Sequence, residues 1–361
     1  MRIMPLNRAV GRRLARPIPS VDPRQMPLLR ANAIVTPAYV RALEQLGIAA
    51  VWIQDDISAD ILPEELVSTA VRMKAARTMG SALESARAAF QRGQGLTTGV
   101  VAQLDAVVDE IGESVSRHRG ASVALEDLAS ADAYTHQHSI DVCALGILLG
   151  RILFAREGWQ DYKGRHRMDG VNRRLHQLGL GLLLHDIGKI AVPSEILNKP
   201  GRLDDAELAI MRTHPEAGAA MLDHDAYSPL VRAVVREHHE RWDGKGYSEG
   251  LAGLGIHQLA RIAAVADVYD AVTSERPYRP AQEPHVGVEV IVSGRGTAFD
   301  PEVVDVFRRL VFPYPVGSEL RLADGSTGVV AAVDVDEPER PLVRFADGER
   351  HVDTGDELLA A

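Results

Sequence analysis

The sequence predicts a mainly α-helical protein, with a helical core between a small N-terminal α/β module and a small C-terminal β-rich, barrel-like domain. Three observations lead to this prediction. Residues 66–312 show helical periodicity almost throughout, residues 1–65 show a helix followed by a strand, and residues 313–361 alternate apolar and polar positions. We place the expected domain boundaries between these stretches. A length of 361 residues accommodates two or three domains.

The N-terminal module is predicted from the stretch "ANAIVTPAYVRALEQLGIAAVWI". Thr36 suits the N-cap of a helix, and Pro37 suits its first position. Gly47 is expected to end this helix. The apolar run from Ala49 to Ile53 then reads as a strand.

The helical core begins with two long amphipathic stretches, "LVSTAVRMKAARTMGSALESARAAF" and "TTGVVAQLDAVVDEIGESVSRH". Residues 156–174 form a polar interruption that we expect to be an exposed loop or a ragged helix end. In the C-terminal domain, the tripeptide Ala-Asp-Gly occurs at 323–325 and again at 346–348. Both are natural hairpin turns, so this domain is predicted to be a small β-barrel or β-meander.

Composition narrows the classes of function and location. The formal net charge of −10 argues against a binder of nucleic acid polymers, which needs a basic surface. Cys143 is the single cysteine, so an internal disulfide is excluded and a reducing cytoplasm fits. The N-terminus lacks the apolar segment of a secretory signal. The most apolar stretch, "VCALGILLGRILFA", is interrupted by Arg151 and judged too short to cross a bilayer, so no membrane insertion is expected.

Histidines and aspartates recur on apolar faces of the predicted core helices. A lone histidine on such a face is usually a hydrogen-bonded core residue, but a buried aspartate must be paired or bind a metal. Seven of them together would be a costly way to fill a core, and metal binding would offset that cost. The seven candidate metal ligands are His138, His185, Asp186, His214, His238, His239 and Asp267.

Two adjacent pairs indicate a site with two metals. His238 and His239 point about 100° apart on a helix, so both can serve one site only if that site is wide. Asp186 follows His185 directly, and its carboxylate can bridge two ions while its neighbour binds one. Two metals a few Å apart can hold a shared hydroxide and stabilise an in-line phosphoryl displacement.

These residues stand in motifs that resemble those of the HD-GYP phosphodiesterases, a branch of the HD-domain metal-dependent phosphohydrolases. The motifs are "DAYTHQHS", "HDIGKIAVPSEILNKPGRL", "MRTHPEAG", "HHERWDGKGY", "ARIAAVADVYDAVTSERPYR" and "GTAFDPEV", in the order of the family over about 125–310. The resemblance implies an HD-type all-helical bundle that hydrolyses cyclic di-GMP to linear pGpG, in some members onward to GMP. It does not cover the end domains.

The resemblance implies the same seven metal ligands, with Asp186 bridging. It also implies that Lys189 binds phosphate and takes part in catalysis with Asp186, and that Arg276 and Tyr247 contact substrate. The other interpretations are a solvated surface lysine, a structural salt bridge and a packed loop tyrosine. By resemblance the two divalent metals are iron or manganese, while ligand chemistry alone also admits nickel, cobalt or zinc.

Three positions depart from the family pattern. Ser248 replaces the proline of Gly-Tyr-Pro, which removes a constraint on the loop but no ligand. Tyr134 stands where some members carry a glutamate for a third metal, so two metals are expected. Ala298 replaces a common polar residue. Asp243 and Gly246 are expected to shape the loop, the glycine by supplying backbone freedom.

The resulting hypothesis is a cytoplasmic cyclic di-GMP phosphodiesterase in which a water or hydroxide bridging two metals attacks phosphorus. Two alternatives are a cyclic di-GMP sensor with little turnover and an HD phosphohydrolase for another cyclic dinucleotide or nucleotide. The sequence leaves open a homodimer and signalling partners that bind the end domains.

Overall fold

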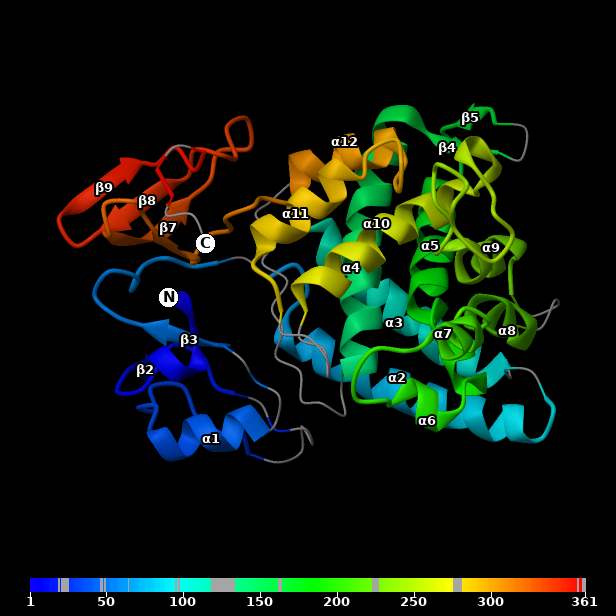
Figure 1. The fold of residues 1–361 in the computed structure, drawn as a ribbon, viewed down its shortest axis with the longest axis horizontal. Coiled ribbons are helices and arrows are strands. Elements are labelled where there is room, and N and C mark those ends of the chain that lie inside the picture. Colours follow the sequence, from blue (N-terminus) through cyan, green and yellow to red (C-terminus); the bar gives the residue numbers. More distant parts are fainter. Residues whose placement is uncertain are drawn as a thin grey trace.

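The structure, a computed structural model, is mainly helical, with small sheets at its two ends (Figure 1). It describes residues 1–18, 20, 26–45, 48, 50–63, 65–94, 96, 98–117, 134–161, 164–222, 227–274, 281–355 and 357–358. Three separate hydrophobic clusters lie within these residues. They span Met4 to Ile53, Leu66 to Val311, and Leu320 to Leu358. The predicted combination of a helical core with flanking α/β and β-rich parts is confirmed.

The N-terminal part contains the predicted helix and strand. Strands β1 (Arg2–Pro5) and β2 (Arg13–Leu14) pair antiparallel with β3 (Ala50–Gln54), and α1 (Pro37–Gln45) precedes β3. The Thr36 hydroxyl accepts a hydrogen bond from the Tyr39 N–H at 3.2 Å, as expected of an N-cap. The predicted end of this helix at Gly47 lies outside the described residues.

The helical part surrounds a central helix, α4 (Tyr134–Glu157). This helix packs against α2 (Thr69–Gln91), α3 (Thr98–Ser116), α5 (Val171–Leu184), α10 (Gln258–Thr273) and α12 (Pro301–Leu310). The remaining helices are α6 (Ser194–Leu197), α7 (Asp205–Met211), α8 (His214–Met221), α9 (Pro229–Glu237) and α11 (Pro284–Ser293). A buried ion pair between Arg72 and Asp141 joins α2 to α4.

The apolar character of α4 follows from this central position. Its segment Gln137–Glu157 is long and apolar enough to cross a membrane by length and composition, with a mean hydropathy of 1.6. The expectation that this stretch is too short was therefore wrong about its length, because the helix continues on both sides of the apolar run. However, 83% of the apolar window is buried inside the protein. Packing against neighbouring helices accounts for the hydropathy.

Two sequence expectations need correction. Residues 156–174 contain a short antiparallel hairpin, β4 (Trp159–Gln160) and β5 (His166–Arg167), where only a loop or ragged helix end was expected. The C-terminal strands β6 (Glu319–Arg321), β7 (Thr327–Ala332), β8 (Leu342–Phe345) and β9 (Gly348–His351) form an open sheet in that order. A closed barrel is thus not confirmed, because four strands this short do not close on themselves. The sheet is a meander, with both Ala-Asp-Gly tripeptides between paired strands.

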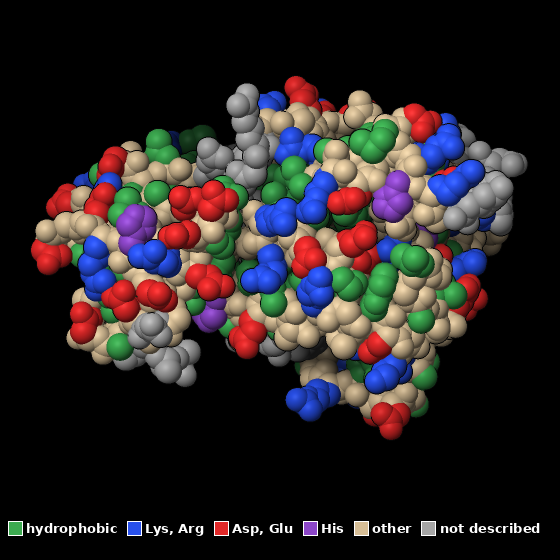
Figure 2. Space-filling model, turned by 90° about the horizontal axis from the view of Figure 1, so that it is seen from above, with side chains coloured by type: hydrophobic (Ala, Val, Ile, Leu, Met, Phe, Trp, Pro, Cys, Tyr) green, Lys and Arg blue, Asp and Glu red, His purple; other side chains and the backbone are tan. Residues whose placement is uncertain are grey.

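The two terminal parts contact each other (Figure 1). The Ile3 N–H donates to the Gly317 carbonyl at 3.1 Å, and Arg2 pairs with Glu319 at 2.9 Å. Arg344 donates to the Ile57 carbonyl at 3.2 Å. Figure 2 shows acidic side chains gathered on these terminal parts, at the left of that view.

Candidate metal centre

The structure brings the seven predicted ligands to one place, from helices α4, α5, α8, α9 and α10 or the residues that follow them. Six are buried and His239 is partly buried. Their nitrogen and oxygen atoms form three overlapping groups, each within 4.8 Å: His214, His238 and His239; His138, His185 and Asp186; His185, His238 and Asp267. Segments far apart in the sequence thus converge on one cluster.

Backbone carbonyls orient three of the imidazoles. In each case Nδ1 lies next to the carbonyl three residues earlier: Leu182 at 2.7 Å for His185, Met211 at 2.8 Å for His214, and Val235 at 2.9 Å for His238. A carbonyl only accepts, so Nδ1 carries the proton and the neutral ring keeps a lone pair on Nε2. These are the second contacts that metal-binding histidines need in order to fix their tautomer.

A carboxylate orients the fourth imidazole. His138 Nδ1 lies 2.5 Å from an Asp270 oxygen, and the Ser274 hydroxyl donates to the other oxygen of Asp270 at 3.1 Å. Asp270 is completely buried. Sequence reasoning did not single out this residue, although it lies one helical turn after Asp267. A second aspartate on the same alanine-rich helix was the available signal.

Asp186 lies between the two sets of histidines. One of its oxygens is 3.3 Å from His214 Nε2, and the other is 3.4 Å from His185 Nε2. Asp267 lies on the His138 side, with an oxygen 3.2 Å from His138 Nε2. The two oxygens of Asp186 therefore face different histidines, which is the arrangement that a bridging carboxylate requires.

The surroundings keep these carboxylates ionised. Burial alone would raise the pKa of Asp186, but Lys189 and the adjacent histidines outweigh it and hold this pKa well below its usual range. Asp267 behaves in the same way because His138 donates to it. Burial lowers the pKa of His138, yet its hydrogen bonds to two aspartates more than compensate and raise the value to about 9. The carboxylates thus favour positive charge at this end of the cluster.

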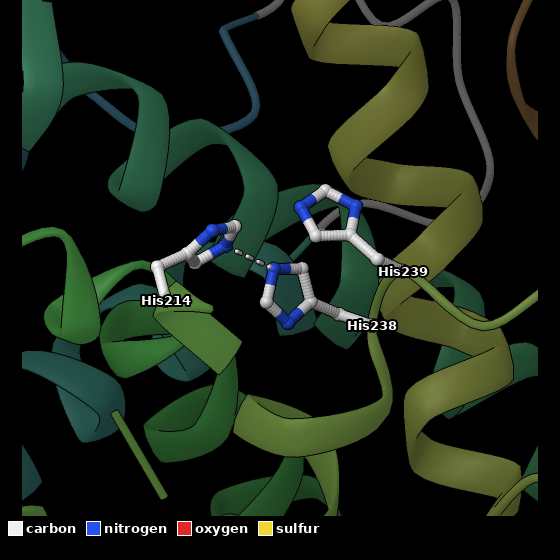
Figure 3. A group of neighbouring side chains, drawn as sticks. All are labelled: His214, His238 and His239. Atoms are coloured by element: carbon white, nitrogen blue, oxygen red, sulfur yellow. Dashed lines mark hydrogen bonds between the residues drawn. The ribbon is translucent and has the colours of Figure 1, made fainter. Parts of the chain in front are cut away.

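The opposite end favours neutral imidazoles. Burial lowers the pKa of His214, lowers that of His238 further, and brings that of His239 to about 4. Two of these neutral rings lie close together, with His214 Nε2 and His238 Nε2 3.3 Å apart (Figure 3). Because each ring already uses Nδ1–H on a carbonyl, two lone pairs face each other there.

This donor set fits divalent cations. His214 Nε2 and His238 Nε2 face each other, and His185 Nε2 is buried without a hydrogen-bond partner among the described residues. A cation at such positions would satisfy nitrogens that nothing else satisfies. Four oriented imidazoles with a further histidine and two ionised carboxylates match the ligand types of transition metals.

Lys189 lies directly beside Asp186. It belongs to the 3-10 turn Ile187–Ala191, and its ammonium is 2.5 Å from an Asp186 oxygen. This turn packs so closely on α8 that a Cβ at Gly188 would lie 1.9 Å from the His214 carbonyl. The glycine in the His-Asp-x-Gly-Lys motif is therefore required for space, and it sets the distance between Lys189 and the cluster.

The loop after His239 lies against the cluster. The Tyr247 ring stacks on His239 with centroids 4.8 Å apart, and the Arg212 guanidinium lies 5.3 Å from the Tyr247 ring centroid. A Cβ at Gly246 would lie 2.4 Å from the Arg241 nitrogen. Gly246 is thus needed for close approach, whereas the φ angles above zero in this loop belong to Gly244 and Gly250. The expectation that Gly246 supplies backbone freedom was wrong.

Carboxylates hold this loop in place. The buried Glu240 accepts three backbone N–H bonds, from residues 249, 250 and 251, at 2.7 to 3.1 Å. Asp243 accepts from the Lys245 N–H and from the Arg241 side chain. Sequence reasoning found Asp243 but missed Glu240, because its partners are backbone groups that leave no pattern in the sequence.

The hydrogen bonds of the departing positions that the structure describes go to residues other than the predicted ligands. Ser248 is exposed, and its hydroxyl lies 3.5 Å from the Arg236 carbonyl. Ala298 contributes its carbonyl, which accepts the Trp242 N–H at 3.1 Å. Arg276 and the side chain of Tyr134 lie outside the described residues.

Comparisons with known proteins match this chain to an HD-domain family model and to phosphodiesterases of cyclic dinucleotides. A family model described as "HD domain" matches residues 163–303. The cyclic di-GMP phosphodiesterase PA4108 of Pseudomonas aeruginosa is 38% identical over 319 residues, which cover 81% of this chain and 72% of that protein. The cyclic di-GMP phosphodiesterase response regulator RpfG of Xanthomonas campestris is 42% identical over 35% of this chain and 34% of its own length. The 3'3'-cGAMP-specific phosphodiesterase 1 of Vibrio cholerae is 43% identical over 30% of this chain and 26% of its own length.

Proposed function

Because the chain belongs to the HD-GYP family of HD-domain phosphodiesterases, we propose that it hydrolyses cyclic di-GMP to pGpG at the cluster around Asp186. The observation that carries this proposal is the pair of histidine sets that face opposite oxygens of one ionised aspartate. The relative that aligns with most of the chain is a cyclic di-GMP phosphodiesterase, which supports the choice of substrate.

The cluster is proposed to hold two divalent cations, iron or manganese, with Asp186 between them. His214, His238 and His239 would serve one cation; His138, His185 and Asp267 would serve the other. The first set is one of the three donor groups. The second set is supported by the distances of an Asp267 oxygen from His138 Nε2 and His185 Nε2, 3.2 and 3.8 Å, and by the unsatisfied His185 nitrogen. When bound, two such cations lower the pKa of water and neutralise phosphate charge.

The side chains around the cluster have separate proposed roles. The Lys189 ammonium, which Asp186 holds in place, would balance negative charge on the non-bridging phosphate oxygens. Tyr247 stacks on His239 at the edge of the cluster, where it would bind the substrate. Arg276 is proposed to bind substrate on the resemblance alone. Asp270 would fix the orientation of His138.

The expected domain bounds of 1–65, 66–312 and 313–361 remain a proposal, which the three separate hydrophobic clusters support. We further propose a cytoplasmic location, and a regulatory role of the terminal parts through signalling partners. A homodimer stays open.

Metal analysis combined with turnover tests the proposed function. We would purify the protein anaerobically, measure metals by elemental analysis, and assay cyclic di-GMP, 3'3'-cGAMP and mononucleotides in parallel. Two metals per chain and release of pGpG are expected. Metal-loaded protein that binds cyclic di-GMP without releasing pGpG would be a sensor, and preferred turnover of another substrate would overturn the substrate assignment.

A further inference from the structure

A pocket lies in the helical part, away from the metal centre. It has a volume of about 320 Å³ and lies where the β4–β5 hairpin meets the beginnings of α5 and α10. Arg174 of this pocket precedes His185 by eleven residues along α5, which corresponds to roughly 16 Å of helix rise. His257, just before α10, precedes Asp267 by ten residues. The pocket therefore lies at the beginnings of α5 and α10, whereas the metal centre lies at the end of α5 and in the second half of α10.

Among the charged side chains that line this pocket, cations outnumber carboxylates. Arg165, Arg167 and Arg174 line it, against the single carboxylate of Asp161. Asp161 pairs with Arg165 at 3.0 Å, whereas Arg167 pairs with Asp169 at 3.2 Å. The pocket lining itself thus carries an excess of positive charge.

Arg174 is placed differently from the other two arginines. Its guanidinium lies 3.9 Å from the centroid of the Trp159 ring and donates to the Gln177 side chain at 2.9 Å. Among the described residues, no carboxylate forms an ion pair with it. Burial and the neighbouring Arg173 lower the pKa of Arg174, and the charge of Asp169 offsets this only in part. Arg174 is therefore oriented by stacking and still able to bind an anion.

A buried amide supplies a second, independent donor. Gln258 is 4% exposed, and its oxygen accepts the Gln160 N–H at 2.8 Å. This bond fixes which end of the amide is the NH2 group. That nitrogen is buried and has no hydrogen-bond partner among the described residues, and Gln258 is one of the residues that line the pocket. A buried donor of this kind requires an acceptor.

His257 adds a third type of donor. Its Nδ1 accepts the Leu259 N–H at 3.2 Å, which leaves the proton of the neutral ring on Nε2. Burial lowers the pKa of His257 to about 4, so the ring is neutral at neutral pH. Guanidinium, amide and imidazole donors thus line one pocket, and an acceptor-rich anion complements all three.

We propose that this pocket is a binding site for a small organic phosphate of about mononucleotide size. The phosphate would accept from Arg174 and from the Gln258 amide, since charge-assisted bonds of guanidinium to phosphate are strong and directional. The volume lies at the lower end of the range of small-ligand sites, about 300–1,000 Å³. The site is independent of the metal centre and of the reaction proposed there.

Calorimetric titration of the purified full chain tests this proposal. The probes are GMP, ribose 5-phosphate, guanosine and inorganic phosphate. GMP and ribose 5-phosphate are expected to bind and guanosine is not. Arg174→Gln and Gln258→Leu should each weaken binding by about tenfold, the magnitude of one bond to a charged group. The matched variant Arg173→Gln changes an exposed arginine next in sequence and should leave the affinity unchanged.

Several results would overturn the proposal. The first is that neither GMP nor ribose 5-phosphate binds at millimolar concentration. The second is that guanosine binds as tightly as GMP, and the third is that neither pocket substitution changes the affinity for GMP. Equal affinity for inorganic phosphate would identify a simple anion site and reject an organic phosphate. Circular dichroism melting of each variant separates lost binding from lost folding. Binding that persists in a variant with both His185→Ala and Asp186→Ala, which lacks two proposed metal ligands, would show independence from the metal centre. Loss of binding in that folded variant would reject the pocket as the site.

Discussion

The metal centre and the loop that follows it meet between His239 and Glu240, yet they are held by opposite kinds of contact. In the centre, backbone carbonyls of helices accept from imidazoles and fix three side chains. In the loop, the carboxylates of Glu240 and Asp243 accept from backbone N–H groups and fix the chain. The first arrangement positions side-chain nitrogens, whereas the second positions a backbone segment.

This difference indicates that metal binding and substrate binding have separate supports. The helices of the centre pack into the hydrophobic core, while much of the loop is partly or fully exposed. Substitutions in one region should leave the property of the other nearly intact. The following four predictions test that separation.

The largest effect is expected for the combined change His185→Ala and Asp186→Ala. It removes a buried nitrogen and the carboxylate between the two histidine sets, so bound metal should be lost and turnover should fall at least about a thousandfold. Elemental analysis and the cyclic di-GMP assay measure both. His176→Ala, on helix α5 directly before these two residues, is the control and should retain metal. Unchanged metal content in the double variant would reject the ligand assignment.

Lys189→Gln should separate metal binding from catalysis within the centre. The change removes the cation beside Asp186 but no ligand atom, so metal content should persist while kcat falls by about a hundredfold, as for the loss of one charge-stabilising donor. Lys199, which pairs with Glu207 at 2.5 Å, provides the matched control Lys199→Gln. Full activity of the Lys189 variant would exclude this lysine from the mechanism.

Glu240→Gln should affect the loop alone. The amide has one accepting oxygen, so at least one of the three backbone N–H bonds is lost, at a cost of about 1–3 kcal/mol. We expect KM for cyclic di-GMP to rise by about tenfold with metal content unchanged. Glu249→Gln, which changes an exposed glutamate of the same loop, is the control. Loss of metal in the Glu240 variant would contradict separate supports.

The smallest effect is expected for Ser248→Pro. Ser248 is exposed, and its hydroxyl lies next to the Arg236 carbonyl. Proline restricts the backbone without removing any N–H bond seen among the described residues. Metal content should stay the same, and KM should fall by about threefold through a stiffer loop. Ser248→Ala is the companion variant, because it removes the hydroxyl without adding the ring. A change in metal content would show that this position influences the centre.

The sequence was most informative where side chains repeat with helical periodicity. The seven candidate ligands lie in helices or directly after them, where the apolar helical periodicity of the preceding residues predicts that they face the core. The turns at the two Ala-Asp-Gly tripeptides were likewise readable, because turn chemistry is local.

Other features depend on contacts that no local pattern records. Glu240 accepts from backbone groups nine to eleven residues away, and Gly246 is needed because the chain passes Arg241 closely. The open C-terminal sheet follows from strand number and length, whereas alternation reveals only which faces are buried. Each of these features depends on which residues lie close together in space, and a single sequence does not record that.

The contacts between the two ends of the chain have a topological consequence. Arg2 pairs with Glu319, and Arg344 reaches back to the Ile57 carbonyl, so residues from both termini make up one composite body. The helical part is then an insertion in the sequence, and the chain segments before and after it both belong to this composite body. A partner that moves the terminal parts would therefore displace two chain segments together, the one that leads into α2 and the one that follows α12.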